Sequence, residues 1–327
     1  MLRRCIPIFL TLVLAAPLAA QRAVPAGRVV SATFWSPIMT VRKVARVYLP
    51  PSYGAGQRRY PVVYYLHGAS GSESDWTAKG HIDATMDSLV AAGLPEMIIV
   101  MPDGDDGWWT TWNALNDPGC ARDTSRRESA ASYCVPWPKY DDYVARDLVA
   151  HVDSNYRTIA DRAHRGVAGL SMGGYGAVSL ALGYPDVFSA AASHSGVLSP
   201  LLGIPHDGRP VPAAEPEDVY ELHDRWPAWL WPSLRLAVGE HDMFASTARD
   251  PARNILRDER RGRPLPPLYV DVGVGDPFLE ENRAFVTHAR AAGARVEYHE
   301  WPGKHDWAYW QTHSRESLAW LAERVAR

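Results

Sequence analysis

The sequence has little net charge and few cysteines. Its 327 residues carry 34 Lys and Arg against 37 Asp and Glu, for a formal net charge of −3, and only three Cys. A charge balance this even gives no reason to expect nucleic acid or an anionic membrane as a partner. The chain also shows no internal repeat and no long linker, which argues against a multidomain arrangement.

Long apolar runs are scarce, and the clearest one lies at the N-terminus. Arg3 and Arg4 precede an apolar run from Ile6 to Ala16, and small residues follow as far as Ala20. This order is typical of a secretory signal peptide, with cleavage expected near residue 20. The run is too short to span a bilayer. We therefore expect a secreted or periplasmic protein without stable membrane insertion, whose signal peptide is residues 1–20.

The shortage of cysteine limits disulfide and metal chemistry. Beyond the signal peptide, the sequence keeps only Cys120 and Cys134. In an exported protein such a pair predicts a disulfide, with two free thiols as the alternative. The pair has no neighbouring Cys or His that would complete a zinc site, so no metal is expected.

The hydrophobic pattern predicts strands that alternate with helices. Strands are expected at 29–35, 41–49, 61–66, 97–101, 166–170, 187–192, 234–238, 268–274 and 296–299. Helices are expected at 81–92, 140–156, 279–292 and 307–325, and a further helix follows residue 173 and stops at Gly183. The first two strands form an antiparallel pair, and the rest predict an α/β fold with a mainly parallel sheet between helices. Because the elements interleave throughout, we expect one domain over 21–327, with insertions at about 105–139 and 199–231.

A nucleophile elbow is predicted at Ser171. The residues Gly169-Leu-Ser171-Met-Gly173 form a Gly-x-Ser-x-Gly pattern between a predicted strand and a predicted helix. A sharp strand-to-helix turn exposes the serine oxygen near the helix N-terminus, where developing negative charge is stabilised. An ordinary glycine-rich turn is the alternative, but the flanking strand and helix favour the elbow.

A serine nucleophile needs a base and an acid that orients the base. In α/β hydrolases these follow the serine in the order acid, then histidine. Asp276 comes after the strand candidate 268–274, and His305 lies between the last strand and the last helix. The alternatives are Asp271 and Asp242 for the acid, and His299 and His194 for the base.

Two backbone N–H groups are expected to form an oxyanion hole. One belongs to Met172, the residue after the nucleophile, and the other to Gly68 or Ala69, which follow the strand ending at Leu66. His67 is expected to be a hydrogen-bonded turn residue and not a catalyst.

The predicted insertions are rich in tryptophan. They contain Trp108, Trp109, Trp112, Trp226, Trp229 and Trp231. Such side chains either pack into small satellite cores or present an aromatic surface to a ligand. Trp108 and Trp109 follow the strand ending at Met101 most closely, so we expect these two to contact the substrate.

Several motifs together resemble the esterase D and antigen 85 group of α/β hydrolases. They are Tyr65–Gly68, Arg165–Ala177, Tyr184–Phe188, Ser195–Gly196 and Pro302–Trp310. That group includes feruloyl and acetyl xylan esterases, S-formylglutathione hydrolases and mycolyltransferases. The resemblance implies an α/β-hydrolase fold, the nucleophile Ser171, the acid Asp276, the base His305, oxyanion donors at Ala69 and Met172, and no cofactor.

These expectations define a function to test. An exported serine carboxylesterase would cleave a small-molecule or carbohydrate ester of the short-acyl, acetyl-sugar or feruloyl type. The first alternative is an acyltransferase of the mycolyltransferase type, in which the same residues pass the acyl group to a hydroxyl other than water. The second is a catalytically silent binding protein on the same scaffold, which an intact triad argues against.

Overall fold

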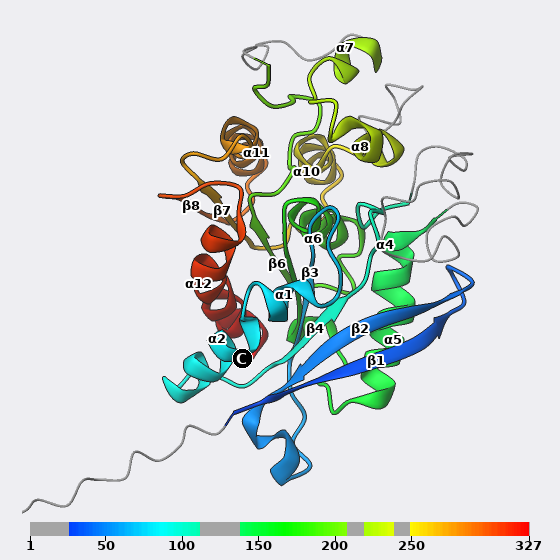
Figure 1. Cartoon of the computed structure of the whole chain (residues 1–327), viewed down its shortest axis with the longest axis vertical. Helices are drawn as coiled ribbons and strands as arrows, with labels where there is room; N and C mark the ends of the chain where they lie inside the picture. Colours follow the sequence, from blue (N-terminus) through cyan, green and yellow to red (C-terminus); the bar gives the residue numbers. More distant parts are fainter. Residues whose placement is uncertain (1–25, 112–137, 208–218, 239–248, 327) are drawn as a thin grey trace, which may run out of the picture.

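The computed structural model describes residues 26–111, 138–207, 219–238 and 249–326. Within them the strands form one eight-stranded sheet in the order β1-β2-β4-β3-β5-β6-β7-β8 (Figure 1). The strand bounds are Arg28–Ser36 (β1), Val41–Leu49 (β2), Val62–Leu66 (β3), Ile98–Pro102 (β4), Arg165–Leu170 (β5), Ala190–His194 (β6), Leu268–Gly273 (β7) and Val296–Trp301 (β8).

The sheet is mainly parallel, as the sequence predicts. β1 pairs with β2 and β2 with β4 in antiparallel register, whereas the pairs from β4 to β8 are all parallel. The carboxyl ends of β3, β5, β6, β7 and β8 therefore meet at one edge. Open α/β sheets bind ligands at this edge, and every residue predicted for the triad follows one of these strand ends.

Helices cover both faces of the sheet (Figure 1). Helices α1, α2 and α12 pack on one face, and η3, α6, α10 and α11 contribute to the core on the other. The helix bounds are Pro51–Ala55 (η1), Asp75–Ala78 (α1), Ile82–Ala91 (α2), Tyr140–Asp142 (α4), Tyr143–Leu148 (η3), Val149–Asn155 (α5), Arg162–His164 (η4), Met172–Gly183 (α6), Val219–His223 (α7), Trp231–Val238 (α8), Pro251–Arg260 (α10), Leu279–Ala291 (α11) and Trp307–Val325 (α12).

Burial on both faces explains the apolar strands at the centre of the sheet. Every residue of β3 is buried, and alternate side chains enter different layers. Tyr64 packs with η3 and α6, whereas its neighbour Tyr65 packs with α2 and α12. Successive side chains of a strand point to opposite faces, so a strand covered on both sides is apolar throughout.

Two predicted elements differ from the structure. The strand expected at 234–238 is wrong, because these residues end helix α8. Leu230, Leu234 and Val238 are buried at a spacing of four, which suits one helix face, and a short apolar run alone does not distinguish strand from helix. The helix expected at 140–156 is present as α4, η3 and α5, and its central turn η3 is a π-helix.

Some sequence predictions lie outside the described residues. These are the signal peptide, the Cys120–Cys134 disulfide, Trp112 and the alternative acid Asp242. The single-domain boundaries also stay a prediction. No helix in the described parts of the chain has the length and apolar character to cross a membrane.

Candidate active site

Ser171 lies in a strained turn between β5 and α6. Its backbone has φ 52° and ψ −117°, a region that residues other than glycine rarely adopt. Two glycines make the turn possible. A Cβ on Gly169 would lie 2.4 Å from the carbonyl oxygen of Gly173, and a Cβ on Gly173 would lie 2.4 Å from that of Leu66. The close packing of strand and helix thus turns the Ser171 side chain out at the end of β5.

The structure brings Ser171, His305 and Asp276 together. His305 Nε2 lies 3.0 Å from Ser171 Oγ, and His305 Nδ1 lies 3.0 Å and 3.2 Å from the two carboxylate oxygens of Asp276. Asp276 follows β7 and also accepts the Phe278 N–H at 2.9 Å. A carboxylate on Nδ1 leaves Nε2 of the neutral ring free to accept the serine proton. This is the geometry of a nucleophile, a base and an orienting acid.

A cleft of about 190 Å³ opens above Ser171 and His305. The imidazole ring of His305 is held between two aromatic rings, Phe278 at 4.7 Å and Trp310 edge-on at 4.9 Å between centroids. The cleft is lined by Gly68, Ala69, Ser70, Asp75, Lys79, Leu170, Ser171, Trp229, Leu230, Phe278, His305, Trp307 and Trp310. His305 keeps 21% of its side chain exposed, whereas Asp276 is sealed beneath it. A ligand in the cleft can therefore reach the serine and the histidine but not the acid.

The loop after β3 forms one wall of this cleft. Gly68 lies close to the nucleophile, since a Cβ there would be 3.4 Å from the Ser171 Cβ and would collide with Leu170. Ala69 follows in the cleft wall. On the other side Met172 is the first residue of α6, where the N–H groups have no acceptor within the helix. The two backbone positions predicted as oxyanion donors thus flank Ser171.

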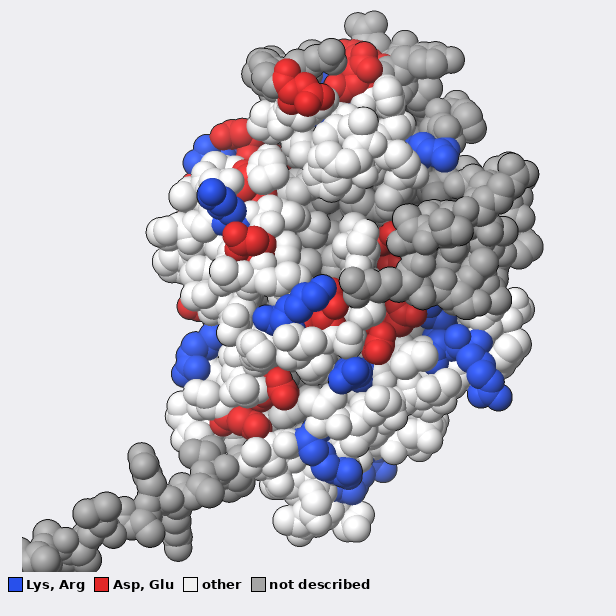
Figure 2. All heavy atoms as spheres, in the orientation of Figure 1, with Lys and Arg blue, Asp and Glu red and all other residues white. Residues whose placement is uncertain are grey.

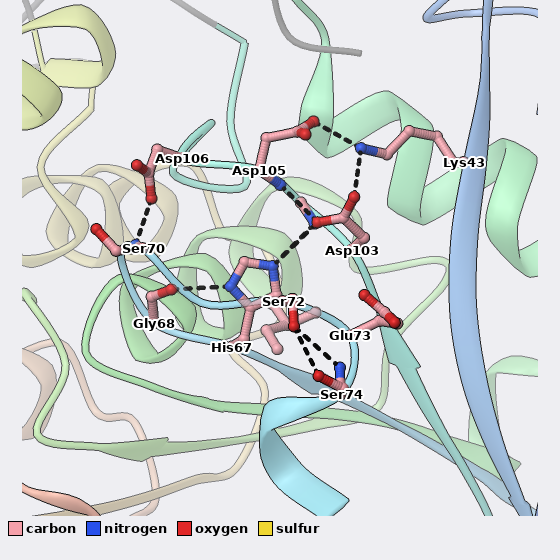
Figure 3. Close-up of polar contacts among 12 residues, drawn as sticks. Lys43, His67, Gly68, Ser70, Ser72, Glu73, Ser74, Asp103, Asp105 and Asp106 are labelled. Atoms are coloured by element: carbon pink, nitrogen blue, oxygen red, sulfur yellow. Dashed lines mark hydrogen bonds and ion pairs between the residues drawn. The ribbon is translucent and has the colours of Figure 1, made fainter. Parts of the chain in front are cut away.

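A buried charged cluster lies behind that loop (Figure 3). We call Lys43, His67, Asp103 and Asp105 the Lys43 cluster. Lys43 Nζ lies 2.6 Å from Asp105 and 3.3 Å from Asp103, and His67 Nε2 accepts the Gly104 N–H at 3.0 Å. His67 Nδ1 donates to the Gly68 carbonyl at 2.8 Å. His67 is therefore a hydrogen-bonded turn residue, as expected, that ties the cleft loop to the end of β4.

The charges of the Lys43 cluster compensate one another. Burial alone would lower the pKa of Lys43, but Asp105 and Asp103 outweigh it and raise that pKa above its usual value. Burial would likewise raise the pKa of Asp103, yet the nearby His67 and Lys43 hold it well below its usual range. Both groups are therefore charged at neutral pH, Lys43 chiefly through Asp105 and Asp103 chiefly through His67 and then Lys43.

The structure corrects the prediction for Trp108 and Trp109. Both side chains are fully buried, and neither lines the cleft that holds Ser171. Trp108 Nε1 donates to Ser233 Oγ at 2.8 Å, and Trp109 Nε1 donates to the His67 carbonyl at 3.2 Å. Both residues have positive φ near 55°, which turns the chain back into the core. Trp109 thus packs against the cleft loop, and Trp108 packs against Tyr175 of α6.

Other tryptophans line the cleft instead. Trp229, which lies in the second predicted insertion, is 70% exposed, and Trp307 and Trp310 come from the start of α12. Phe278, which contacts His305, was missed by the sequence reasoning. Phe278 follows the predicted acid Asp276 by two residues, and this short separation could have indicated that its ring lies near the base His305.

Two alternative site residues pair with each other. His194, at the end of β6, lies 2.8 Å from Asp271 of β7 through its Nδ1, and both side chains are fully buried. His299 lies on β8, stacked on Trp301 with ring centroids 5.0 Å apart. None of the three lines the cleft with Ser171.

The site offers no cluster of metal ligands. Among the described residues, no group of three or more His, Cys, Asp or Glu is arranged to hold a metal ion. Acidic and basic side chains are interspersed on the face drawn in Figure 2, without an extended patch of one sign.

Known proteins with the same architecture were found by sequence and by structure. One relative is an endo-1,4-beta-xylanase/feruloyl esterase of Xylanibacter ruminicola, 30% identical over 50% of this chain but only 20% of its own length. An acetyl esterase of Caldicellulosiruptor saccharolyticus is 23% identical over 80% of this chain and 83% of its own. This chain thus spans well under two thirds of some curated relatives it matches.

A solved structure shares the fold over nearly the whole chain. A ferulic acid esterase superposes with a TM-score of 0.66 at 26% identity, over 92% of this chain and 99% of its own. The model of the Esterase family matches residues 36–321. That match includes Ser171, Asp276 and His305. The chain belongs to the Esterase family.

Proposed function

We propose that the protein is a serine carboxylesterase that works through an acyl-enzyme on Ser171. The observation that carries the proposal is the pair of contacts made by His305, 3.0 Å to Ser171 Oγ and 3.0 Å to Asp276, within an open cleft. This arrangement supports nucleophilic attack on a carbonyl carbon, with Asp276 holding the tautomer of His305. Export through residues 1–20 belongs to the same proposal.

The reaction follows from these positions. As Ser171 Oγ bonds to the ester carbon, its proton passes to His305 Nε2, and the N–H groups of Ala69 and Met172 bind the oxyanion. Collapse of this intermediate breaks the ester bond, and the leaving alcohol takes the proton from His305. A water molecule then gives a proton to His305 as it attacks the acyl carbon. The carboxylic acid leaves, and the proton returns to Ser171.

The cleft supports esters with an aromatic or sugar portion. Trp229 and Trp307 present apolar faces in the cleft that holds His305, and such faces bind phenyl rings and the apolar faces of sugars. The feruloyl and acetyl esterase names of the relatives agree with this class. We infer that a short acyl, acetyl-sugar or feruloyl ester is the substrate.

The proposal is tested with the purified chain on p-nitrophenyl, feruloyl and acetyl-sugar esters. Ser171→Ala should lower kcat by several orders of magnitude because the nucleophile is lost. Ser179→Ala is the matched control, since Ser179 lies on the same helix α6 outside the cleft. Activity of Ser171→Ala within about tenfold of the wild type would disprove the nucleophile. Transfer of the acyl group to an added alcohol in preference to water would favour an acyltransferase.

A further inference from the structure

The protein contains a second serine–histidine–aspartate array, which we call the sealed array: Ser317, His194 and Asp271. His194 Nε2 lies 2.8 Å from Ser317 Oγ, and His194 Nδ1 lies 2.8 Å from Asp271. All three residues have no exposed surface, so no ester can reach them. An array with these contacts and no access needs a role other than nucleophilic catalysis.

The sealed array attaches helix α12 to the sheet. His194 ends β6 and Asp271 lies on β7, whereas Ser317 belongs to α12. Tyr309, also on α12, donates its hydroxyl to the second oxygen of Asp271 at 3.0 Å, and Tyr65 of β3 lies 2.5 Å from Ser317 Oγ. Three strands thus hold one helix through directional polar contacts, inside a layer that is otherwise apolar.

Tyr309 carries this attachment to the loop of His305. Its ring packs against Gly303, where a Cβ would lie only 2.4 Å from the ring. Gly303 in turn accepts the Gly275 N–H at 2.9 Å. Gly275 precedes Asp276, and Gly303 lies two residues before His305. The loop of the acid and the loop of the base therefore meet at Gly303, which packs against the ring of Tyr309.

The same array reaches the nucleophile through the backbone. The carbonyl oxygen of His194 accepts the N–H of Ser171 at 2.9 Å. In the next residue, Ser195 Oγ accepts the indole N–H of Trp310 at 3.2 Å, and Trp310 lies against the His305 ring. One strand end thus contacts the serine side and the histidine side of the active site.

We propose that Tyr309, held by Asp271, is a positioning residue that keeps His305 aligned with Ser171 and Asp276. The proposal rests on the proposed esterase function. Catalysis depends on hydrogen-bond geometry, and a displacement of about 1 Å can lower a rate about 100-fold. An apolar contact alone would let the ring of Tyr309 shift against Gly303. The hydrogen bond from the Tyr309 hydroxyl to the buried carboxylate of Asp271 is directional, so it fixes the position of the ring.

The test compares two tyrosine variants of the full chain. Tyr309→Phe keeps the ring against Gly303 and removes only the bond to Asp271. Tyr298→Phe is the matched control, since Tyr298 donates to Glu300 at 2.8 Å on β8 and does not line the cleft. We expect Tyr309→Phe to lower kcat at least fivefold with KM within twofold of the wild type. The NMR signal of the His305 Nδ1 proton should shift in Tyr309→Phe and stay unchanged in Tyr298→Phe.

A kcat for Tyr309→Phe less than fivefold below the wild type, with an unshifted His305 signal, would overturn the proposal. If Tyr309→Phe does not fold, Ser317→Ala is measured by the same criteria, because it detaches α12 at its other anchor. The NMR signal separates the two proposals. If the wild type hydrolyses no ester but the signal still shifts in Tyr309→Phe, the esterase function fails and the positioning holds.

Discussion

Two arrays of the same three residue types lie around one sheet, and they differ in access. In the cleft, His305 contacts Ser171 and Asp276 at 3.0 Å, and 21% of its side chain is exposed. In the sealed array, His194 has contacts of 2.8 Å on both sides and no exposure. The tighter contacts belong to the array that no substrate can reach. Distances alone therefore do not identify an active site.

The backbone around each serine makes the same distinction. Ser171 stands at the start of α6, where N–H groups without helical acceptors are available to an oxyanion. Ser317 lies within α12, where Ser317 Oγ also donates to the Ser314 carbonyl at 3.1 Å. In the interior of a helix the N–H groups are already bonded to carbonyls. Only the cleft array combines a nucleophile with free backbone donors.

The sharpest test exchanges the acid in each array. Asp276→Asn should lower kcat by about 10⁴-fold, because His305 then holds the wrong tautomer, and leave stability nearly unchanged. Asp271→Asn should instead cost about 2 kcal/mol of unfolding free energy, because an amide replaces the buried carboxylate that accepts from Tyr309 and faces His194 Nδ1. Kinetics and urea unfolding of both variants measure this. Equal losses of stability in the two variants would erase the distinction between the arrays.

A second test asks whether other sealed charges act on stability, as the sealed array does. Lys43→Met leaves Asp103 and Asp105 buried without their cation and should cost about 3–5 kcal/mol. Arg283→Met is the matched control, because Arg283 pairs with Glu280 and Glu300 at the surface and should cost under about 1 kcal/mol. Urea unfolding at neutral pH distinguishes the two, and similar losses would contradict the comparison.

The Lys43 cluster also predicts a pH dependence with a definite sign. The folded pKa of Asp103 is depressed, so its contribution to stability is fully present above about pH 4 and is lost as pH falls below that value. In Lys43→Met the folded pKa of Asp103 should rise toward its usual value. The variant should therefore lose less unfolding free energy than the wild type between pH 4 and pH 2.

The smallest expected effect concerns access to the cleft. Trp229→Ala should raise KM about three- to tenfold for feruloyl or other aryl esters, and less for an acetate ester that does not reach Trp229. Trp35→Ala is the control, since Trp35 is also exposed but lies on the edge strand β1. An equal change in KM for large and small esters would mean that Trp229 does not contact the part of the substrate that distinguishes large esters from small ones.

The sequence predicted the contacts that depend on local patterns. Periodicity and chain order predict the strand, turn and helix around Ser171. They also place Asp276 and His305 just after strands. The structure brings these three residues into contact. The burial of Trp108 and Trp109 depends on contacts with Ser233 and His67, which are distant in sequence. No local pattern shows whether a loop aromatic folds inward or outward. The sealed array likewise needs three strands and a helix to be placed before His194 meets Ser317.

Helix α12 gives the chain an order of assembly. The base loop at 302–306 directly precedes its residues 307–325, and His305 follows Ser171 by 134 positions. The nucleophile is therefore synthesised well before its partner and before the helix that supports that partner. A nascent chain that has already folded the elbow thus remains without its base. The proposed chemistry requires α12 to dock first.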